Sequence, residues 1–184
     1  EMAKFLLTKG VTAFCPTTVT VTNEEIAKSL ETVRSSMADK EGARIVGVNM
    51  EGPFISPAKK GAQGDEFIQA PDFDVFKAYY DGCGGIIRLV DIAPECDVRG
   101  DFIEKASKLC TVSVAHTATD YDGAKAAFRR GATHATHLFN AMSGMTHRAP
   151  GVVGAVFDTD TVCGELICDG IHIHPAVVRT AFRQ

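Results

Sequence analysis

RIVGVNM, at residues 44–50, runs directly into Glu51-Gly52-Pro53. The apolar run is short and rich in β-branched side chains, and it stops at a Gly-Pro turn, so it predicts a buried strand. A carboxylate therefore follows the carboxyl end of the strand. This order, an apolar strand and then a polar side chain, recurs along the chain and decides the fold class.

Five further runs have the length and composition of strands. They are VTAFC (11–15), IIRLVDIA (86–93), TVSVAH (111–116), ATHATHL (132–138) and TVCGELICD (161–169). Several of them are apolar on both faces, which is typical of a parallel sheet covered on both sides.

Helical patterns separate these strands. Thr22 and Glu25 have the spacing of a capping box before apolar residues at helical intervals. Residues 72–81 and a segment near 100–110 are also predicted to be helical. Thr119 and Asp122 are predicted to cap a helix that Gly131 ends, and Pro175 is predicted to open the last one.

Strands that alternate with helices predict right-handed βαβ units, in either an open doubly wound sheet or a (β/α)8 barrel. No glycine-rich dinucleotide fingerprint follows any strand, which disfavours the open sheet. Glu51, His116, His137 and His172 follow four of the six strands. Because barrel enzymes carry their chemistry at the carboxyl ends of strands, we predict a TIM-type barrel of which this chain holds about six strands.

The chain is therefore expected to be the central part, residues 1–184, of one (β/α)8 catalytic domain. It starts on an apolar helix with no strand before it and stops inside a helix. Both ends look like cuts, so the first and last barrel strands are expected to lie outside this chain.

Composition excludes several classes of protein. The 184 residues carry 19 Lys+Arg against 23 Asp+Glu, a net charge of −4 without long runs, which argues against a nucleic-acid partner. No apolar stretch approaches the ~20 residues of a membrane span, and the first ten residues contain no signal-peptide pattern. The six cysteines form no C-x-x-C and are interpreted as small buried hydrophobes in a reducing cytosol, which predicts a cytoplasmic protein.

Glu51, His116 and His137 are the central candidates for chemistry. A carboxylate and two imidazoles suit Zn²⁺ or a similar divalent ion and leave positions open for water. Each residue taken alone is more often a loop carboxylate or a hydrogen-bonded structural histidine, but three at successive strand ends favour a metal site. His134 and His137 point to opposite faces of a regular strand, and His137 is favoured because it lies nearer the strand's end.

A basic residue beside this edge suggests an anionic substrate. Arg148 can bind a phosphate through two hydrogen bonds, although a surface arginine is an equal alternative on sequence alone. Asn140 and the backbone at Ala141 can exchange hydrogen bonds with a sugar. His172, directly after Asp169-Gly170, is placed at the same edge.

At these residues the sequence resembles a known family. NMEGPFISPAKKGAQ (49–63), VAHTATDYDGA (114–124), THATHLFNAM (133–142), RAPGVVGAVFD (148–158) and DGIHIHP (169–175) together are similar to the N-acetylglucosamine-6-phosphate deacetylases of the amidohydrolase superfamily. The similarity runs over nearly the whole chain, and it is the combination of these segments in this order that is specific.

The resemblance implies a metal-bearing barrel with a small β domain, built from both chain ends and outside this chain. It implies one divalent metal, Zn or Fe, on Glu51, His116 and His137, with a second metal open for the full-length protein. It implies a homodimer. The family's catalytic Asp would lie beyond Gln184, so no catalytic residue is expected in this chain, and Asp169 is not given that role.

The resemblance also implies the substrate-binding residues. Arg148 matches the arginine for the 6-phosphate, Asn140 and Ala141 match the segment at the sugar, and His172 matches a substrate-binding histidine. Gln63 stands where the family varies between His and Gln, with a weaker substrate or metal role.

The function implied is hydrolysis of N-acetylglucosamine 6-phosphate to glucosamine 6-phosphate and acetate. Two alternatives stay open. One is a deacetylase for another N-acetyl amino-sugar phosphate, such as N-acetylgalactosamine 6-phosphate. The other is a catalytically silent, metal-free sugar-phosphate-binding relative. This chain alone is expected to be inactive.

Overall fold

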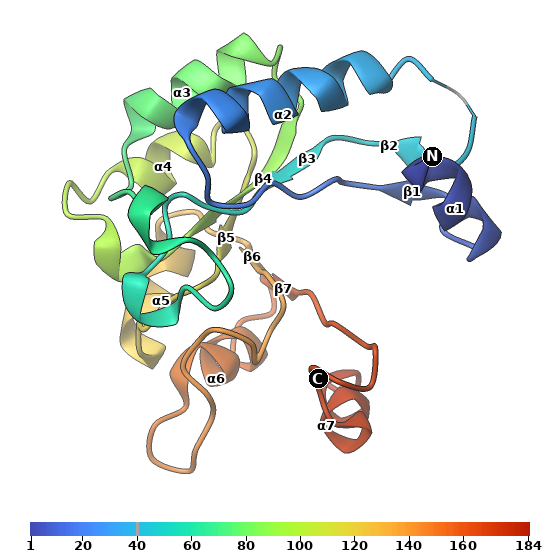
Figure 1. The fold of residues 1–184 in the computed structure, drawn as a ribbon. Coiled ribbons are helices and arrows are strands. Elements are labelled where there is room, and N and C mark those ends of the chain that lie inside the picture. The colour runs from blue at the N-terminus through green and yellow to red at the C-terminus, as the bar shows by residue number, and fades with distance from the viewer. Residues whose placement is uncertain (40) are drawn as a thin grey trace.

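A computed structural model describes residues 1–39 and 41–184 of the chain. Helices and strands alternate through the described residues, as Figure 1 shows. The strands are β1 (Ala13–Phe14), β2 (Arg44–Ile45), β3 (Val48–Met50), β4 (Ile87–Ile92), β5 (Thr111–Val114), β6 (His134–Ala135) and β7 (Cys163–Gly164). The α-helices are α1 (Met2–Thr8), α2 (Asn23–Ser36), α3 (Phe73–Gly82), α4 (Phe102–Ala106), α5 (Tyr121–Arg129), α6 (Gly151–Phe157) and α7 (Pro175–Ala181). Short 3-10 helices are η1 (Pro57–Lys59), η2 (Asp65–Phe67) and η3 (Pro94–Cys96).

All strand pairs are parallel. Strands β3 to β7 form one five-stranded sheet in chain order, and β1 pairs with β2 in a two-stranded sheet. A bridge between Thr17 and Asn49 links the two sheets. The predicted strand over 44–50 is therefore present as β2 and β3, interrupted at Gly47, whose φ of 155° and close approach to Arg88 leave no room for a side chain. Six predicted strand positions are occupied, and the prediction of a partial parallel barrel is confirmed.

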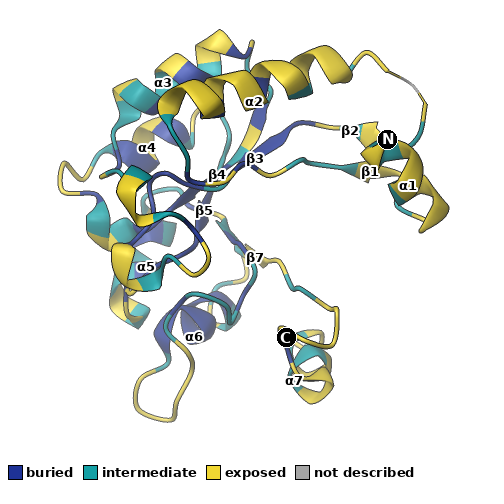
Figure 2. Cartoon of the chain, viewed as in Figure 1, coloured by how far each residue is buried: buried dark blue, intermediate teal, exposed yellow. Residues whose placement is uncertain are grey.

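The helices cover one face of the sheet. In Figure 1, α2, α3, α4 and α5 follow one another along that face, and in Figure 2 the strands beneath them are largely buried. Branched side chains of β4 and β5, such as Val90 and Val112, fill the layer between sheet and helices. Three buried aromatic rings extend this core: Phe102 lies 5.1 Å from Phe54 and 5.6 Å from Phe76 between ring centroids. The hydrophobic core therefore lies between the sheet and the helices. The opposite face of the sheet is turned to the barrel interior.

Helices α1 and α7 extend away from this body in Figure 1. Neither contains a buried residue, and each exposes a large apolar side chain, Phe5 at 61% and, just after α7, Phe182 at 76%. No helix among the described residues is long and apolar enough to cross a membrane.

Some of the predicted helix caps and strand lengths are confirmed and others are wrong. The Thr22–Glu25 capping box is confirmed at α2, and Pro175 opens α7. The cap predicted for α5 is wrong, because the Asp120 carboxylate accepts the hydrogen bond from the Gly123 N–H and makes Asp120 the cap. Strands β6 and β7 are shorter than predicted, and α6 is a helix that the sequence pattern did not indicate.

The cysteines are free throughout the described part of the chain. Their interpretation as small buried hydrophobes holds for Cys83, which is buried, and in part for Cys15, Cys96 and Cys110, which are half-buried. Burial raises the pKa of the Cys110 thiol to about 12. The interpretation is wrong for Cys163 and Cys168, which are exposed because the β7 segment lies at the edge of the sheet.

Candidate metal centre

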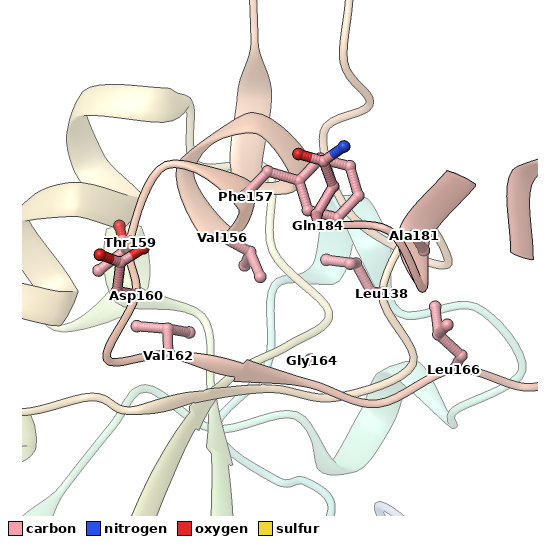
Figure 3. Close-up of a pocket in the computed structure, with 10 residues that line it drawn as sticks. All are labelled: Leu138, Val156, Phe157, Thr159, Asp160, Val162, Gly164, Leu166, Ala181 and Gln184. Atoms are coloured by element: carbon pink, nitrogen blue, oxygen red, sulfur yellow. The ribbon is translucent and has the colours of Figure 1, made fainter. Parts of the chain in front are cut away.

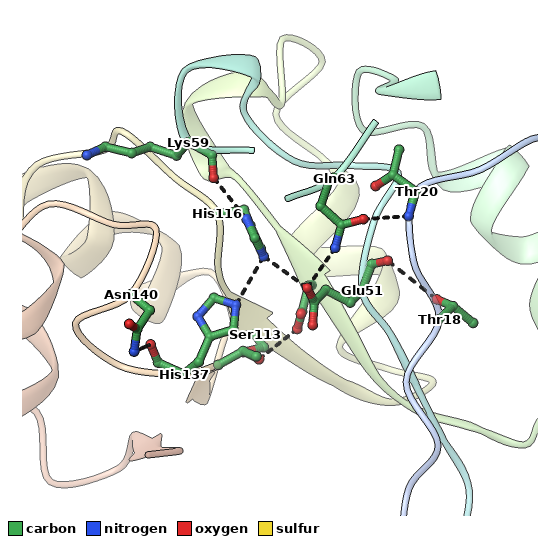
Figure 4. Close-up of polar contacts among 11 residues, drawn as sticks. Thr18, Thr20, Glu51, Lys59, Gln63, Ser113, His116, His137 and Asn140 are labelled. Atoms are coloured by element: carbon green, nitrogen blue, oxygen red, sulfur yellow. Dashed lines mark hydrogen bonds and ion pairs between the residues drawn. The ribbon is translucent and has the colours of Figure 1, made fainter. Parts of the chain in front are cut away.

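Three strand ends bring Glu51, His116 and His137 together. Glu51 directly follows β3, His116 lies just beyond β5, and His137 lies just beyond β6. One ligand atom from each residue can be chosen so that all lie within 4.8 Å of one another. Figure 4 shows the two imidazoles and the carboxylate pointing at a common centre. The predicted meeting of three residues distant in sequence is therefore present in the structure.

The contacts at this centre join atoms that carry lone pairs. His116 Nε2 lies 3.0 Å from Glu51 Oε1 and 3.0 Å from His137 Nε2. The other ring nitrogen of His116, Nδ1, lies 2.9 Å from the carbonyl oxygen of Lys59. A carbonyl can only accept, so Nδ1 carries the proton and Nε2 of the neutral ring is a bare lone pair.

His116 Nε2 and Glu51 Oε1, two acceptors 3.0 Å apart, repel each other unless a cation lies between them. The cation can be a proton or a metal ion, and one carboxylate with two imidazoles is a ligand set that Zn²⁺ and Fe²⁺ both accept. The Nδ1–H contact of His116 with a carbonyl is the usual way in which a metal-binding histidine is held in its ligand tautomer. Nδ1 of His137 is buried and has no hydrogen-bond partner in the described part of the chain. The residues present therefore fit a divalent metal.

The pKa directions agree with a centre that holds positive charge beside Glu51. Burial works to raise the pKa of the Glu51 carboxyl, but the hydrogen bond and charge of His116 outweigh it and the pKa is lowered. Burial likewise works to lower the pKa of His116, and the hydrogen bonds to Glu51 and Lys59 reverse the sign. The pKa of His137 is lowered by burial and by the neighbouring charge of His116. A lowered pKa favours the free base of His137, which is the form of an imidazole that a metal requires.

Gln63 holds the carboxylate of Glu51. Its Nε2 donates a hydrogen bond to Glu51 Oε1 at 2.8 Å, and its Oε1 accepts one from the Thr20 backbone N–H at 2.6 Å (Figure 4). Both ends of the amide are used, so Gln63 fixes the carboxylate against the loop that follows β1. Of the predicted substrate-binding residues, Gln63 is the one that bonds to a side chain of the three-residue cluster in the described part of the chain.

The backbone at both histidines is strained. His116 has φ 42° and His137 has φ 36°, in the left-handed region that L-residues rarely adopt and that costs of order 1–3 kcal/mol. The segment after His116 is held from outside: the Glu95 carboxylate accepts from the Thr117 hydroxyl at 2.5 Å and from the Ala118 N–H at 2.6 Å. Strain that the surroundings maintain is typical of a functional site.

Gly52 is required directly beside Glu51. Its φ is +74°, and a Cβ there would lie 2.1 Å from the Thr20 hydroxyl oxygen. We expect Gly52→Ala to lower the free energy of unfolding by about 1–3 kcal/mol and to weaken metal binding, because the backbone that aims Glu51 must shift. Denaturant unfolding and competition with a chelator measure the two effects.

Gly100→Ala is the matched control for that substitution. Gly100 has φ +70° and nothing within 4 Å of an added Cβ, so the variant carries the backbone cost without the clash. It is expected to lose stability and to keep its metal affinity. A Gly52→Ala protein that binds metal like the Gly100→Ala protein would contradict the role given to Gly52.

Asn140 and Ala141 lie in the segment that leaves His137. The Asn140 Nδ2 donates to the His137 carbonyl oxygen at 3.3 Å. Ala141 has φ 50°, and its carbonyl oxygen accepts a hydrogen bond from the Thr117 N–H at 3.0 Å. The Ala141 carbonyl therefore joins the two histidine-bearing segments, while the Asn140 amide holds the turn that leaves His137. The sugar role predicted for both residues stays a prediction.

Arg148 and His172 lie apart from the contacts of the cluster. Arg148 is exposed in the loop between β6 and α6. His172 is exposed, and its Nδ1 lies 2.7 Å from the Asp169 carboxylate. The backbone N–H groups of His172 and Ile171, with the His172 ring, lower the pKa of Asp169 to about 2. Asp169 is thus engaged in holding the His172 turn.

A cavity of about 520 Å³ opens beside the cluster on the barrel-interior face. Glu51 and His137 are among its lining residues, together with Asn49, Arg88 and Glu165. A different pocket, of about 260 Å³, is drawn in Figure 3 and lies between α6, the β7 segment and the end of α7. Leu138 and Val156 line it, and none of the three metal-site residues does. The first cavity, and not the second, adjoins the chemistry.

Comparisons with known proteins agree with this geometry. N-acetylglucosamine-6-phosphate deacetylase of Bacillus subtilis is 39% identical over 186 residues, which cover 98% of this chain and 47% of that protein. The human enzyme of the same name is 36% identical over 191 residues, 99% of this chain and 46% of that protein. Over nearly its whole length the chain is similar to N-acetylglucosamine-6-phosphate deacetylases. It spans about half the length of the curated relatives it matches, and no family model matches it.

Solved structures of the same family share the fold. A mutant of the Mycobacterium smegmatis deacetylase in complex with N-acetyl-D-glucosamine-6-phosphate superposes with a TM-score of 0.85 at 31% identity, over 94% of this chain and 45% of that one. The Thermotoga maritima deacetylase gives 0.87 at 28% identity, over 99% of this chain and 49% of that one. The deacetylase resemblance inferred from the motifs is thereby confirmed.

Sequence reasoning missed a set of polar residues that surround the ligands. Glu95 follows a strand end, as the ligands do, and that position was the available signal. Asp91, Ser113 and Thr136 lie inside strand patterns that read as apolar, at alternate positions facing the barrel interior. Only the period of two along each strand could have indicated them.

Proposed function

We propose that this chain is the metal-holding part of an N-acetylglucosamine-6-phosphate deacetylase, a hydrolase of amino-sugar catabolism. The observation that carries the proposal is the convergence of Glu51 Oε1, His116 Nε2 and His137 Nε2 with the tautomer of His116 fixed. Residues 1–184 are, on this proposal, the central part of one (β/α)8 domain. The remaining strands, the small β domain and the catalytic Asp are supplied by other parts of the full-length protein.

Each residue of the proposed site has a task. Glu51, His116 and His137 hold one divalent ion, Zn²⁺ or Fe²⁺, with a second metal open for the full-length protein. When bound, the ion supplies Lewis-acid polarisation of water and of the acetamide carbonyl. Gln63 keeps the Glu51 carboxylate in place. The backbone at Ala141 and the Asn140 amide bind the sugar.

Two further residues bind the ends of the substrate. Arg148 pairs with the 6-phosphate, so that binding energy remote from the amide orients the reacting group. His172, whose Nδ1 is held by the Asp169 carboxylate, binds the acetamide end of the substrate. An Asp outside this chain takes the proton of the attacking water and delivers it to the departing amine.

The surroundings of the reaction follow from the same family assignment. We place the enzyme in the cytoplasm as a homodimer, with an amino-sugar phosphate as partner and neither nucleic acid nor membrane. The free cysteines throughout the described residues suit a reducing compartment.

Acetate release tests the proposal. The full-length protein, loaded with Zn²⁺ or Fe²⁺, is expected to release one acetate per N-acetylglucosamine 6-phosphate and to lose turnover when a chelator removes the metal. Parallel kinetics on N-acetylgalactosamine 6-phosphate identify the preferred epimer. Saturable binding of the sugar phosphate without acetate from either epimer would instead establish a silent binding protein.

Arg148→Met tests the phosphate role. We expect KM for N-acetylglucosamine 6-phosphate to rise about 10–100-fold, because a charge-assisted pair with the phosphate is lost, and kcat to fall less. Arg34→Met, on the outer helix α2, is the control and should change neither value. An unchanged KM in the Arg148 variant would remove this residue from the phosphate site.

A further inference from the structure

Four polar side chains form a continuous chain beneath the metal centre. Thr136 Oγ1 donates to Asp91 Oδ1 at 2.8 Å, Ser113 Oγ lies 2.8 Å from Thr136 Oγ1, and His134 Nδ1 lies 2.9 Å from Ser113 Oγ. These residues, Asp91, Ser113, His134 and Thr136, are called the inner polar chain below. It crosses three neighbouring strands, β4, β5 and β6 with the residue after it, on the face turned from the helices.

The alternation of side chains along each strand places the inner polar chain inside the barrel. The residues that flank its members along each strand belong to the hydrophobic core under the helices. They are Val90, Ile92, Val112, Val114 and Ala135. Because successive side chains of a strand point to opposite faces, the inner polar chain lies on the same face as the cavity beside Glu51 and His137.

The direction of its hydrogen bonds follows from the number of protons. A hydroxyl has one proton, and Thr136 donates its proton to Asp91 in a hydrogen bond. Ser113 must therefore be the donor to Thr136, and it has no proton left for His134. His134 then donates from Nδ1 to the Ser113 oxygen. All the hydrogen bonds of the inner polar chain therefore point in one direction, from His134 to Asp91. Each of them depends on Asp91 as the final acceptor.

Ending the inner polar chain on Asp91 lowers the stability of the protein. Its side chain is fully buried, and its Oδ2 has no hydrogen-bond partner among the described residues. Burial first, and then the charge of Glu51, raise the pKa of this carboxyl well above its ordinary value. Apolar side chains of similar size would fill the same space without this penalty. A buried polar group that costs stability calls for a functional reason.

The position of the inner polar chain next to the metal ligands gives a functional reason for the buried Asp91. Thr136 directly precedes His137, and Ser113 lies on β5, the strand that leads to His116. Asp91 lies one residue beyond the pair Met50–Val90 in the register of β3 and β4, at the level of Glu51. Both histidines have left-handed backbones, which stay in place only when their neighbours hold them.

We propose that the inner polar chain is a positioning device for the metal centre: anchored on Asp91, it fixes Thr136 and, through it, the strained backbone of His137, and so sets the metal affinity. This inference rests on the proposed function in requiring a bound divalent metal. It does not depend on which substrate is hydrolysed. Its members are positioning residues, because none of them is one of the three ligands.

The test is the affinity of the full-length protein for Zn²⁺, measured by competition with a chromophoric chelator. Thr136→Val removes the hydroxyl at nearly constant shape and is expected to weaken binding about 10–100-fold. Thr136→Ser keeps the hydroxyl and should bind within about threefold of the unchanged protein. Asp91→Leu should weaken binding as Thr136→Val does, and the double variant no further, because both changes break the same link.

A merely structural role predicts a different pattern. Thr159→Val, at the end of α6, loses a hydroxyl that donates to the Ala155 carbonyl oxygen and should lower stability without changing Zn²⁺ affinity. If the Thr136 and Asp91 variants behave like it, with unfolding of the metal-free protein shifted and Zn²⁺ affinity within threefold, the inference is overturned. Should Asp91→Leu not fold, Ser113→Ala breaks the chain more gently and is judged by the same criterion.

The outcomes also separate this inference from the proposed function. A protein that binds Zn²⁺ in the expected order of variants but releases no acetate supports the positioning device and rejects the deacetylase activity. A protein that releases acetate while Thr136→Val binds Zn²⁺ normally does the reverse. A protein that binds no Zn²⁺ or other divalent ion rejects both.

Discussion

Glu51→Gln in the full-length protein is expected to weaken the binding of Zn²⁺ by at least about 100-fold and to abolish acetate release. The substitution keeps the shape of the side chain but replaces an anionic ligand by a neutral amide. Loss of groups around a metal site costs about 10–100-fold in affinity, and a ligand itself should cost more. The amide would also face Gln63 and His116 without the charge that both now contact. Chelator competition and metal analysis of the purified variant measure the effect.

Glu165→Gln is the matched control. Glu165 lines the same cavity as Glu51 and is also a carboxylate, but it is not one of the three clustered ligands. Its neutralisation should leave Zn²⁺ affinity within about threefold. If Glu51→Gln retained its metal as Glu165→Gln does, the assignment of Glu51 as a ligand would be wrong.

Phe102→Ala is expected to lower the free energy of unfolding by about 3–5 kcal/mol. The Phe102 ring is fully buried between Phe54 and Phe76, so its removal leaves a cavity that the sheet and helices cannot close. Phe54 lies in the loop that follows Glu51, and the same change is therefore expected to loosen the metal centre. Denaturant unfolding of the metal-free protein measures the loss.

Val98→Ala removes an apolar side chain of which 90% is exposed, from the loop just before α4. Surface changes of this kind stay within about 0.5 kcal/mol. A Phe102→Ala protein as stable as the Val98→Ala protein would show that the three aromatic rings do not form the core described above.

The sequence predicted the ligands because their position follows from a simple rule. Parallel strands end at one edge, and polar residues directly after them meet there. Glu51, His116 and His137 obey this rule, although the alternation argument at His134 and His137 assumed a regular strand. The strand is not regular: β6 ends at Ala135, and the left-handed turn at His137 redirects its side chain.

The rest depended on tertiary packing that a local pattern does not contain. Helix α6, Gly151–Phe157, has two glycines and three valines, which are poor helix formers, and all but one of its residues are buried. Its surroundings, and not its propensity, make it helical. The inner polar chain could not be predicted from the sequence for a similar reason. A single Asp, Ser or Thr within an apolar strand finds its hydrogen-bond partner on a neighbouring strand, which a local pattern does not show.

Anomalous diffraction from crystals of the full-length protein grown with Zn²⁺ tests the three-ligand metal site most directly. We predict one strong anomalous peak about 2.0–2.2 Å from Glu51 Oε1, His116 Nε2 and His137 Nε2. A fully loaded protein whose zinc lies elsewhere, with these three side chains bonded only to one another, would contradict it.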